Sequence, residues 1–285
     1  MTTICHGRRP ISRIGNLANK PAPVSLAPQT EWVKTLVRGP KLSKPLSEAQ
    51  CLELAEALLA GSVDPRVLAA VAASWRIRGE TGVELGTIAG HLGKHVSTQM
   101  DVSGCLLVDY PSDGGKQAAR LDEIRACCDF PVLACGVSAA IYPVKAETPH
   151  YDLNWRELLP QVVAAAESLE VFGLRTFLHT VLKTIWIPGA LGLVKGVTHP
   201  PYAAASAEAL IVQGAPSAVI VQSKSGQPEL QAGRRHRVTR VLGGQSSEHV
   251  LFAGEGEGQG VETDEVPAAT AKLWRAVARH TELNF

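Results

Sequence analysis

The chain has 285 residues, of which 45% are hydrophobic and 19% charged, with 28 basic side chains against 27 acidic ones. This length allows one large or two modest domains, and the composition excludes a wholly disordered chain. No apolar run approaches ~18 residues, which excludes a membrane-spanning helix. The six cysteines form no CxxC pair, so we expect no zinc ribbon and no disulfide framework, but a protein of the reducing cytoplasm.

Charge is unevenly distributed at the start of the chain. Residues 1–45 contain eight basic side chains and one acidic side chain, Glu31. We expect residues 1–30 to form a basic, flexible tail. Such a tail either attracts the phosphate groups of nucleic acid or is simply solvated.

Residues 31–97 are predicted to form a helical domain. Three helices there begin with capping signals, which are Ser47 with Gln50, Asp64 with Pro65, and Thr81 with Glu84. Apolar residues at helical spacing follow each signal, as expected for helices that bury one face.

Further along the chain, short apolar runs alternate with helical segments. The predicted strands are 105–108, 132–135, 192–197, 218–221 and 249–252. The predicted helical segments are 157–186, 203–213 and 267–279, whereas 229–242 alternates like a hairpin and 253–266 is a loop. Buried strands that alternate with helices are typical of a mostly parallel sheet. The predicted fold class is therefore α/β, with a helical domain beside an α/β domain over 98–156 and 187–285.

Three local patterns have both a functional and an ordinary explanation. Asp113-Gly114-Gly115-Lys116 lies between a strand and a helix, where backbone N–H groups bind anions, but a plain glycine turn explains it as well. The basic stretch 233–240 either binds phosphate or protects an edge strand from pairing. His91 and His95 have the spacing of metal ligands, but exposed helical histidines are the favoured interpretation.

Segments spread over roughly residues 36–280 resemble the anthranilate phosphoribosyltransferases, and residues 36–97 resemble the helical domain of that family. The segments that carry the resemblance are Leu58-Leu59-Ala-Gly-Ser62, Trp75-Arg-Ile-Arg-Gly-Glu-Thr81, Gly173-Leu-Arg-Thr-Phe177 and Val219–Leu230. The resemblance implies the fold of glycosyltransferase family 3, shared by class IV phosphoribosyltransferases and nucleoside phosphorylases. In that fold a small helical domain, usually dimeric, lies beside an α/β domain, and residues 157–186 would return to the helical domain.

Positions that match the family's active-site motifs are partly rewritten. Gly114 and Gly115 remain of the phosphate loop, whereas Ala134–Val137 lacks the lysine and asparagine of a second motif. Pro228 replaces the aspartate of the acidic pair that holds magnesium, and only Glu229 remains. The resemblance therefore implies an eroded site for phosphoribosyl pyrophosphate.

An active glycosyl- or phosphoribosyltransferase is the alternative. It would hold pyrophosphate with Gly114, Gly115 and Lys116, magnesium with Glu229, and an aromatic or carboxylate acceptor with Arg175, which matches a family arginine that contacts the aromatic acid. A lone carboxylate is a poor magnesium site. We therefore expect no cofactor, and magnesium only under this alternative.

A more specific resemblance is to the divergent YbiB-type branch of anthranilate phosphoribosyltransferase-like proteins. The matching segments are 110–117, 135–138, 174–183, 197–202 and 266–274. This resemblance implies a homodimer, formed through the helical domain, that binds single-stranded DNA through a basic groove with little sequence preference. The expected groove residues are Lys116, Arg175 and Lys183 from the matched motifs, Arg120 and Lys195 beside them, and Arg76 and Arg78 as weaker additions. A purely structural or partner-binding dimer stays open as a third possibility.

Overall fold

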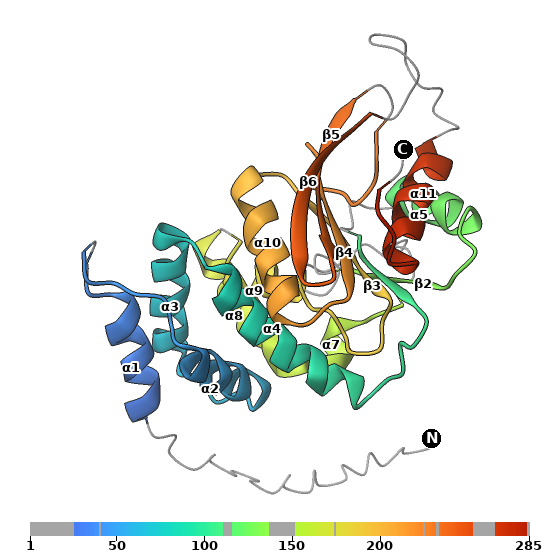
Figure 1. Ribbon diagram of the computed structural model, residues 1–285. Coiled ribbons are helices and arrows are strands. Elements are labelled where there is room, and N and C mark those ends of the chain that lie inside the picture. The colour runs from blue at the N-terminus through green and yellow to red at the C-terminus, as the bar shows by residue number, and fades with distance from the viewer. Residues whose placement is uncertain are drawn as a thin grey trace, which may run out of the picture.

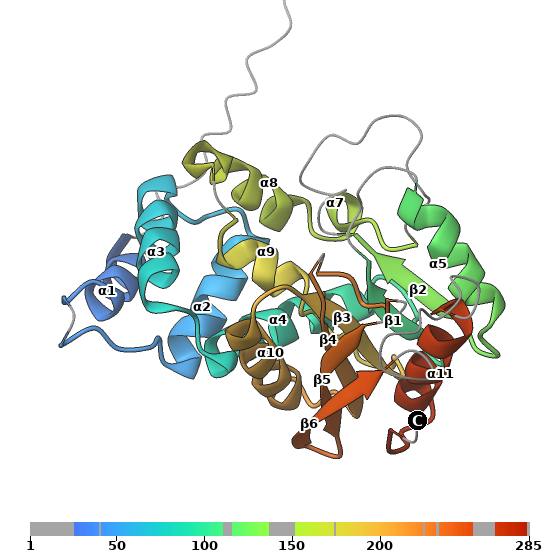
Figure 2. The same ribbon diagram turned by 90° about the horizontal axis from the view of Figure 1, so that it is seen from above.

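The computed structural model describes residues 26–39, 41–110, 116–136, 152–173, 175–224, 226–231, 234–252 and 266–283. Within these ranges the N-terminal helices lie together on one side of the molecule and a six-stranded sheet lies on the other (Figures 1 and 2). The expected features that fall outside the described residues are the tail up to residue 25, Gly114 and Gly115, and the loop over 253–265.

The helical region begins earlier than predicted. Helix α1 (Leu26–Leu36) starts inside the segment that we expected to be a flexible tail, and its Trp32 and Leu36 side chains are buried in the core. Their spacing of four residues places both on one face of the helix. That buried face fixes α1 to the molecule, so the predicted tail boundary at residue 30 is wrong.

Three further helices begin where the capping signals placed them. They are α2 (Glu48–Leu59), α3 (Pro65–Arg78) and α4 (Gly82–Ser97). Both capping boxes form, and the Asp64 carboxylate accepts a hydrogen bond from the Arg66 backbone N–H. These local signals were therefore sufficient to place the start of each helix.

The sheet combines four parallel strands with an antiparallel pair. Its strand order is β2-β1-β3-β4-β5-β6, in which β2, β1, β3 and β4 run parallel and β5 and β6 are antiparallel to their neighbours. The strands are β1 (Leu106–Asp109), β2 (Val132–Cys135), β3 (Gly192–Val197), β4 (Ser217–Gln222), β5 (Arg235–Leu242) and β6 (Gln245–Phe252). The first four confirm the strands predicted from apolar runs to within one residue at either end.

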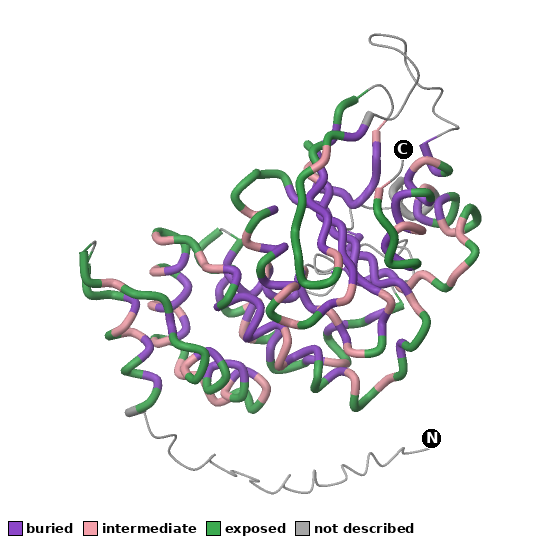
Figure 3. The backbone as a smooth tube through the Cα atoms, viewed as in Figure 1, coloured by how far each residue is buried: buried purple, intermediate pink, exposed green. Residues whose placement is uncertain are grey.

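The hairpin lies further along the chain than predicted. We expected it over 229–242, but β5 is one continuous strand that pairs with β6 across a turn at Gly243 and Gly244. Both glycines have positive φ angles, 57° and 79°, which suit the tight turn between twisted antiparallel strands. Because β5 is interior and the mostly exposed β6 is the edge (Figure 3), the interpretation of residues 233–240 as an edge strand is wrong.

Helices cover both faces of the sheet. On one face α5 (Lys116–Ala126) and α11 (Val266–Ala278) share a core cluster with Leu106 and Val108 of β1. On the other face α10 (Pro200–Val212) shares a core cluster with Leu107 of β1. Successive strand residues point to opposite faces, so β1 to β5 each supply both clusters. This arrangement confirms the predicted α/β fold class.

The core cluster that contains Leu107 continues from the sheet into the N-terminal helices. Helix α4 packs along α10, and the close approach needs glycine, because a Cβ atom at Gly86 would lie 2.6 Å from the Ala209 carbonyl oxygen. The segment after residue 154 forms α7 (Trp155–Leu158), α8 (Pro160–Ser168), the 3-10 helix η1 (Glu170–Phe172) and α9 (Phe177–Leu182). Helix α8 packs against α2 and α3, and α9 packs against α3 and α4.

None of the helices in the described ranges is long and apolar enough to cross a membrane.

Candidate functional site

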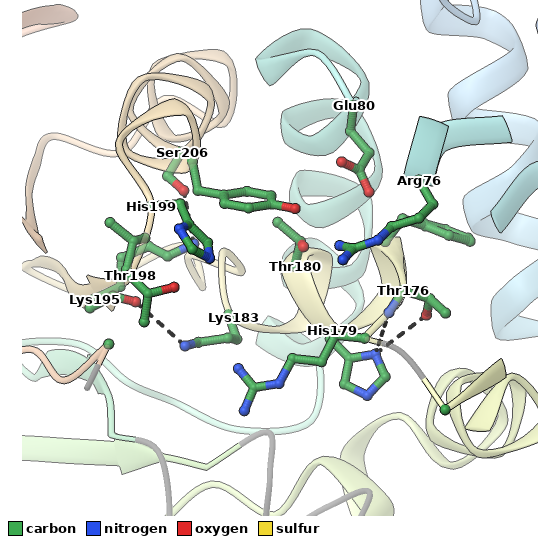
Figure 4. A pocket seen from close by; sticks show the side chains of 17 residues that line it. Arg76, Glu80, Thr176, His179, Thr180, Lys183, Lys195, Thr198, His199 and Ser206 are labelled. Atoms are coloured by element: carbon green, nitrogen blue, oxygen red, sulfur yellow. Dashed lines mark hydrogen bonds between the residues drawn. The ribbon is translucent and has the colours of Figure 1, made fainter. Parts of the chain in front are cut away.

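A cavity of about 420 Å³ opens where the carboxyl end of β3 meets the start of α10 (Figure 4). Its walls come from the end of α3, residues 173–183 and residues 195–206. The described Arg, Lys, Asp and Glu side chains of the lining are four cations and one acid, namely Arg76, Arg175, Lys183, Lys195 and Glu80. Ligands of parallel α/β sheets bind at the carboxyl ends of strands, and the excess of positive charge here favours an anion.

Helix α10 begins at the wall of this cavity. His199 is its N-cap residue, and Pro200 and Pro201 occupy the first turn, where a backbone N–H has no partner within the helix. Tyr202 and Ser206, one turn apart, both line the cavity. Since the N-terminal end of a helix carries partial positive charge, α10 adds to the positive field of the four cations.

Two lysines that line the cavity, Lys183 and Lys195, lie beside the buried Asp109, which does not itself line it. Asp109 and Lys195 are direct neighbours across the β1–β3 pair, so their side chains leave the same face of the sheet. Lys183 Nζ lies 3.1 Å from Asp109 Oδ2. Lys195 Nζ donates to Thr184 Oγ1 at 2.6 Å and to Ser206 Oγ at 3.0 Å. These contacts join β1, β3, the end of α9 and α10 into one polar cluster.

Burial controls the protonation of the two fully buried members of this cluster. Burial raises the pKa of the Asp109 carboxyl, and the Lys183 and Lys195 charges oppose that rise. Burial, with a smaller contribution from the Lys183 charge, lowers the pKa of Lys195 to about 7. Lys195 is therefore partly a neutral amine at neutral pH, whereas a lysine in water is almost fully charged.

His179 provides a neutral donor near the rim cations. The Thr176 backbone N–H donates to His179 Nδ1 at 3.1 Å, in a capping box at the start of α9. Burial, followed by the positive charge of Arg175, lowers the pKa of His179 to about 4. Because Nδ1 accepts a hydrogen bond in the neutral ring, Nε2 carries the proton.

The structure brings four of the predicted groove residues together and separates the others. Those that line the cavity are Arg76, Arg175, Lys183 and Lys195. Arg120 instead lies 2.9 Å from Glu229, and Arg78 binds both carboxylate oxygens of Glu84 at 2.6 Å. Lys116 begins α5, but its side chain, like Gly114 and Gly115, lies outside the described residues.

Glu229 occupies a closed ion pair rather than an open metal site. Its carboxylate is fully buried, and it accepts hydrogen bonds from the Tyr110 hydroxyl at 2.6 Å and from Arg120 at 2.9 Å. Magnesium requires octahedral oxygen ligands, and the preceding residue here is Pro228. In the described part of the chain, no three His, Cys, Asp or Glu side chains are grouped to hold a metal. These residues do not fit a magnesium ion.

Arg240, from the basic stretch 233–240, is a core residue. Its side chain donates to the Ser217 hydroxyl at 2.8 Å and to the carbonyl oxygens of Ala218 and Val241. Burial lowers its pKa to about 10. The guanidinium therefore satisfies buried acceptors beside β4, and the interpretation of this arginine as a phosphate ligand is wrong.

Solved structures of anthranilate phosphoribosyltransferases are similar to this chain. The Thermus thermophilus enzyme (TrpD) has a TM-score of 0.54 at 20% identity, covering 86% of this chain and 81% of that one. The Saccharomyces cerevisiae enzyme gives 0.58 in its complex with 4-fluoroanthranilate and 0.56 with PRPP and Mg, each at 13% identity over 88% of this chain and 80% of that one. The chain has the anthranilate phosphoribosyltransferase fold. No protein-family model and no curated protein sequence matches it.

Sequence reasoning missed several side chains of the cavity and its floor. They are Glu80, Asp109, His199, Tyr202 and Ser206. Glu80 and Tyr202 lie inside segments that carry the family resemblance, and Asp109 ends a predicted strand where ligands of parallel sheets bind. These positions in the sequence were the signals from which the three residues could have been predicted as part of the site.

Proposed function

We propose that the protein binds single-stranded nucleic acid, with little sequence preference, at the cationic cavity and the surface around it. The observation that carries the proposal is the convergence of Arg76, Arg175, Lys183 and Lys195 on one cavity beside the N-terminus of α10. Cations hold phosphate oxygens without reading the bases.

The gradient of exposure supports a chain-like ligand. Arg76 and Arg175 are exposed, Lys183 is half-buried and Lys195 is buried, so basic side chains extend from the rim to the floor of the cavity. A phosphodiester backbone can run along the exposed arginines while one nucleotide enters the cavity. The His199 and Tyr202 rings, 6.4 Å apart, offer aromatic surface on which a base can stack.

The state of Glu229 favours binding over phosphoribosyl transfer. The carboxylate that would hold magnesium under the alternative is fully buried and accepts hydrogen bonds from Tyr110 and Arg120. Electrostatic stabilisation of departing pyrophosphate needs cations or metal at the leaving group. In the described residues, no three His, Cys, Asp or Glu side chains are grouped to hold a metal for that step.

Fluorescence anisotropy of a labelled single-stranded oligonucleotide tests the proposal. We expect the double variant Arg76→Ala/Arg175→Ala to weaken binding about tenfold or more, evenly across sequences, because each charged contact to phosphate contributes ~1 kcal/mol or more. The matched control is Arg66→Ala/Lys94→Ala, which removes two exposed cations that do not line the cavity. Equal affinity of the cavity variant and the wild type would refute the proposed site.

A second candidate is the transferase itself, and the size of the cavity favours it. A volume of about 420 Å³ lies within the range of small-molecule sites, and the fold is that of enzymes that bind phosphoribosyl pyrophosphate. This candidate requires magnesium ligands outside the described residues. A rise of several degrees in melting temperature with phosphoribosyl pyrophosphate and magnesium would support it, and no shift at millimolar concentrations would exclude it.

We also propose that the chain forms a homodimer through its N-terminal helices. Exposed apolar side chains there, which favour contact with a second copy, are Val37, Leu42, Ile77 and Val83. Light scattering should give twice the mass of one chain for the wild type and the mass of one chain for Ile77→Asp. Val250→Asp, which changes an exposed apolar residue of β6, serves as the control and should remain dimeric.

A further inference from the structure

Lys195 differs from the other cations of the cavity in its surroundings. Its side chain is 2% exposed, yet it lines the cavity floor together with Ser206 (Figure 4). In the described part of the chain its hydrogen-bond partners are two hydroxyls, those of Thr184 and Ser206. Lys183, in contrast, forms an ion pair with Asp109. Lys195 therefore lacks the carboxylate contact that would hold its ammonium form.

The geometry around Lys195 suits a neutral amine. A neutral lysine has two N–H bonds and one lone pair, and the Thr184 and Ser206 hydroxyl oxygens accept two hydrogen bonds from Nζ. The lone pair is then left over for another reaction. Desolvation and a neighbouring cation are the two conditions that activate lysine nucleophiles, and both are met here.

We propose that Lys195 is a nucleophile that forms an imine with an aldehyde or ketone carrying a phosphate or carboxylate group. The exposed Arg76 and Arg175 would hold the anionic group, while the carbonyl carbon reaches the floor. This inference goes beyond nucleic-acid binding and does not depend on it.

The reaction is a condensation that needs no oxidant or reductant. The Nζ lone pair attacks the carbonyl carbon, a C–N bond forms, and one amine proton passes to the carbonyl oxygen to give a carbinolamine. The C–O bond then breaks, and the oxygen leaves as water with the second amine proton. The Thr184 and Ser206 hydroxyls, within 3.0 Å of Nζ, are placed to relay these protons.

The charge on Lys195 is set by groups from several elements. Lys183, at the end of α9, disfavours the ammonium form, and Asp109 of β1 favours it. The other titratable or charged groups that line the cavity are Arg76, Glu80, Arg175, His179, His199 and Tyr202. Since Asp109 is already paired with Lys183, the neutral amine of Lys195 persists near neutral pH.

Trapping with pyridoxal 5′-phosphate and borohydride tests the inference on the wild-type protein. Borohydride delivers hydride to the imine carbon and fixes the adduct as a secondary amine, which peptide mass spectrometry assigns to a residue. We expect Lys195 to label with a midpoint near pH 7, whereas a lysine in water labels only as pH approaches ~10. Pyridoxal, which lacks the phosphate, should label Lys195 at least tenfold less at equal concentration.

The outcomes separate a reactive lysine from a structural one. Labelling of Lys195 in urea but not in the native protein, or with the pH dependence of a lysine in water, would overturn the inference. Equal labelling by pyridoxal and its phosphate would overturn the requirement for an anionic group. Lys195→Arg keeps a basic side chain but should abolish the specific adduct. The assignment of the labelled residue in the wild-type protein remains a valid test even if this variant fails to fold.

Discussion

Lys183 and Asp109 form a buried ion pair, with Nζ 3.1 Å from Oδ2, although one follows α9 and the other ends β1. The pair joins the end of β1 to the end of α9, the helix that contains His179 and begins two residues after Arg175. A charged group in this position either supports binding or stabilises the fold, and variants of the two partners can tell the roles apart.

Removal of one partner should cost more stability than removal of both. Lys183→Met leaves the buried Asp109 carboxylate without its ion-pair partner, and we expect the free energy of unfolding to fall by about 3 kcal/mol. Lys183→Met/Asp109→Asn should recover at least half of this loss, because the uncompensated charge is gone. Urea unfolding of the wild type, both single variants and the double variant completes the cycle. Additive single effects would contradict the ion pair.

The stability of the protein should rise with pH above 7 because of Lys195. Its pKa is about 7 in the folded chain and 10.5 in the reference state, so the unfolded chain binds more protons between those values. The free energy of unfolding therefore increases with pH across this window, and below pH 7 the contribution is constant. We expect a gain of about 1–2 kcal/mol between pH 7 and pH 9, measured by urea unfolding.

Lys195→Met supplies the control for this pH effect. The variant lacks the titrating amine, so its gain between pH 7 and pH 9 should be smaller than that of the wild type by the same amount. Parallel curves for the two proteins would mean that Lys195 keeps an ordinary pKa in the fold.

The contact between α4 and α10 should discriminate between two glycines on one helix. A Cβ atom at Gly86 would lie 2.6 Å from the Ala209 carbonyl oxygen, so Gly86→Ala should destabilise the protein by about 1–3 kcal/mol. At Gly90 the nearest atom would be Gln213 Cγ at 3.1 Å, so a shift of a few tenths of an ångström, with the Gln213 amide still bonded to Trp186 and Thr184, relieves the contact. Gly90→Ala should be neutral or stabilise by up to about 1 kcal/mol through helix propensity. Equal effects in urea unfolding would refute the difference in packing.

Local signals predicted most of the fold. The capping boxes at Ser47 and Thr81 and the apolar runs of β1–β4 depend on neighbouring residues, and the structure confirms them. The hairpin predicted over 229–242 is wrong because the chain turns only at Gly243-Gly244, after the alternating stretch ends. Burial of Arg240 was not predictable, since its acceptors on Ser217 and Ala218 reach it only through the pairing of β4 with β5.

The site was predictable only in part, because the strand order assembles it. Arg175 and Lys183 were found through motif resemblance, and they do line the cavity. Arg120 was placed by proximity in sequence, but its contact with Glu229 depends on where distant segments meet. The pairing of Asp109 with Lys195 likewise requires β1 beside β3, which no local pattern specifies.

The salt dependence of single-stranded DNA binding tests the central proposal most directly. Anisotropy titrations at several salt concentrations give log K against log salt, whose slope should be about −0.7 for each phosphate that the protein neutralises. We predict micromolar or tighter binding at low salt and a slope of about −2 or steeper for the wild type. For Arg76→Ala/Arg175→Ala we predict a slope that is shallower by about one to two units. No binding at micromolar protein, or a slope that these substitutions leave unchanged, would contradict nucleic-acid binding at the cavity.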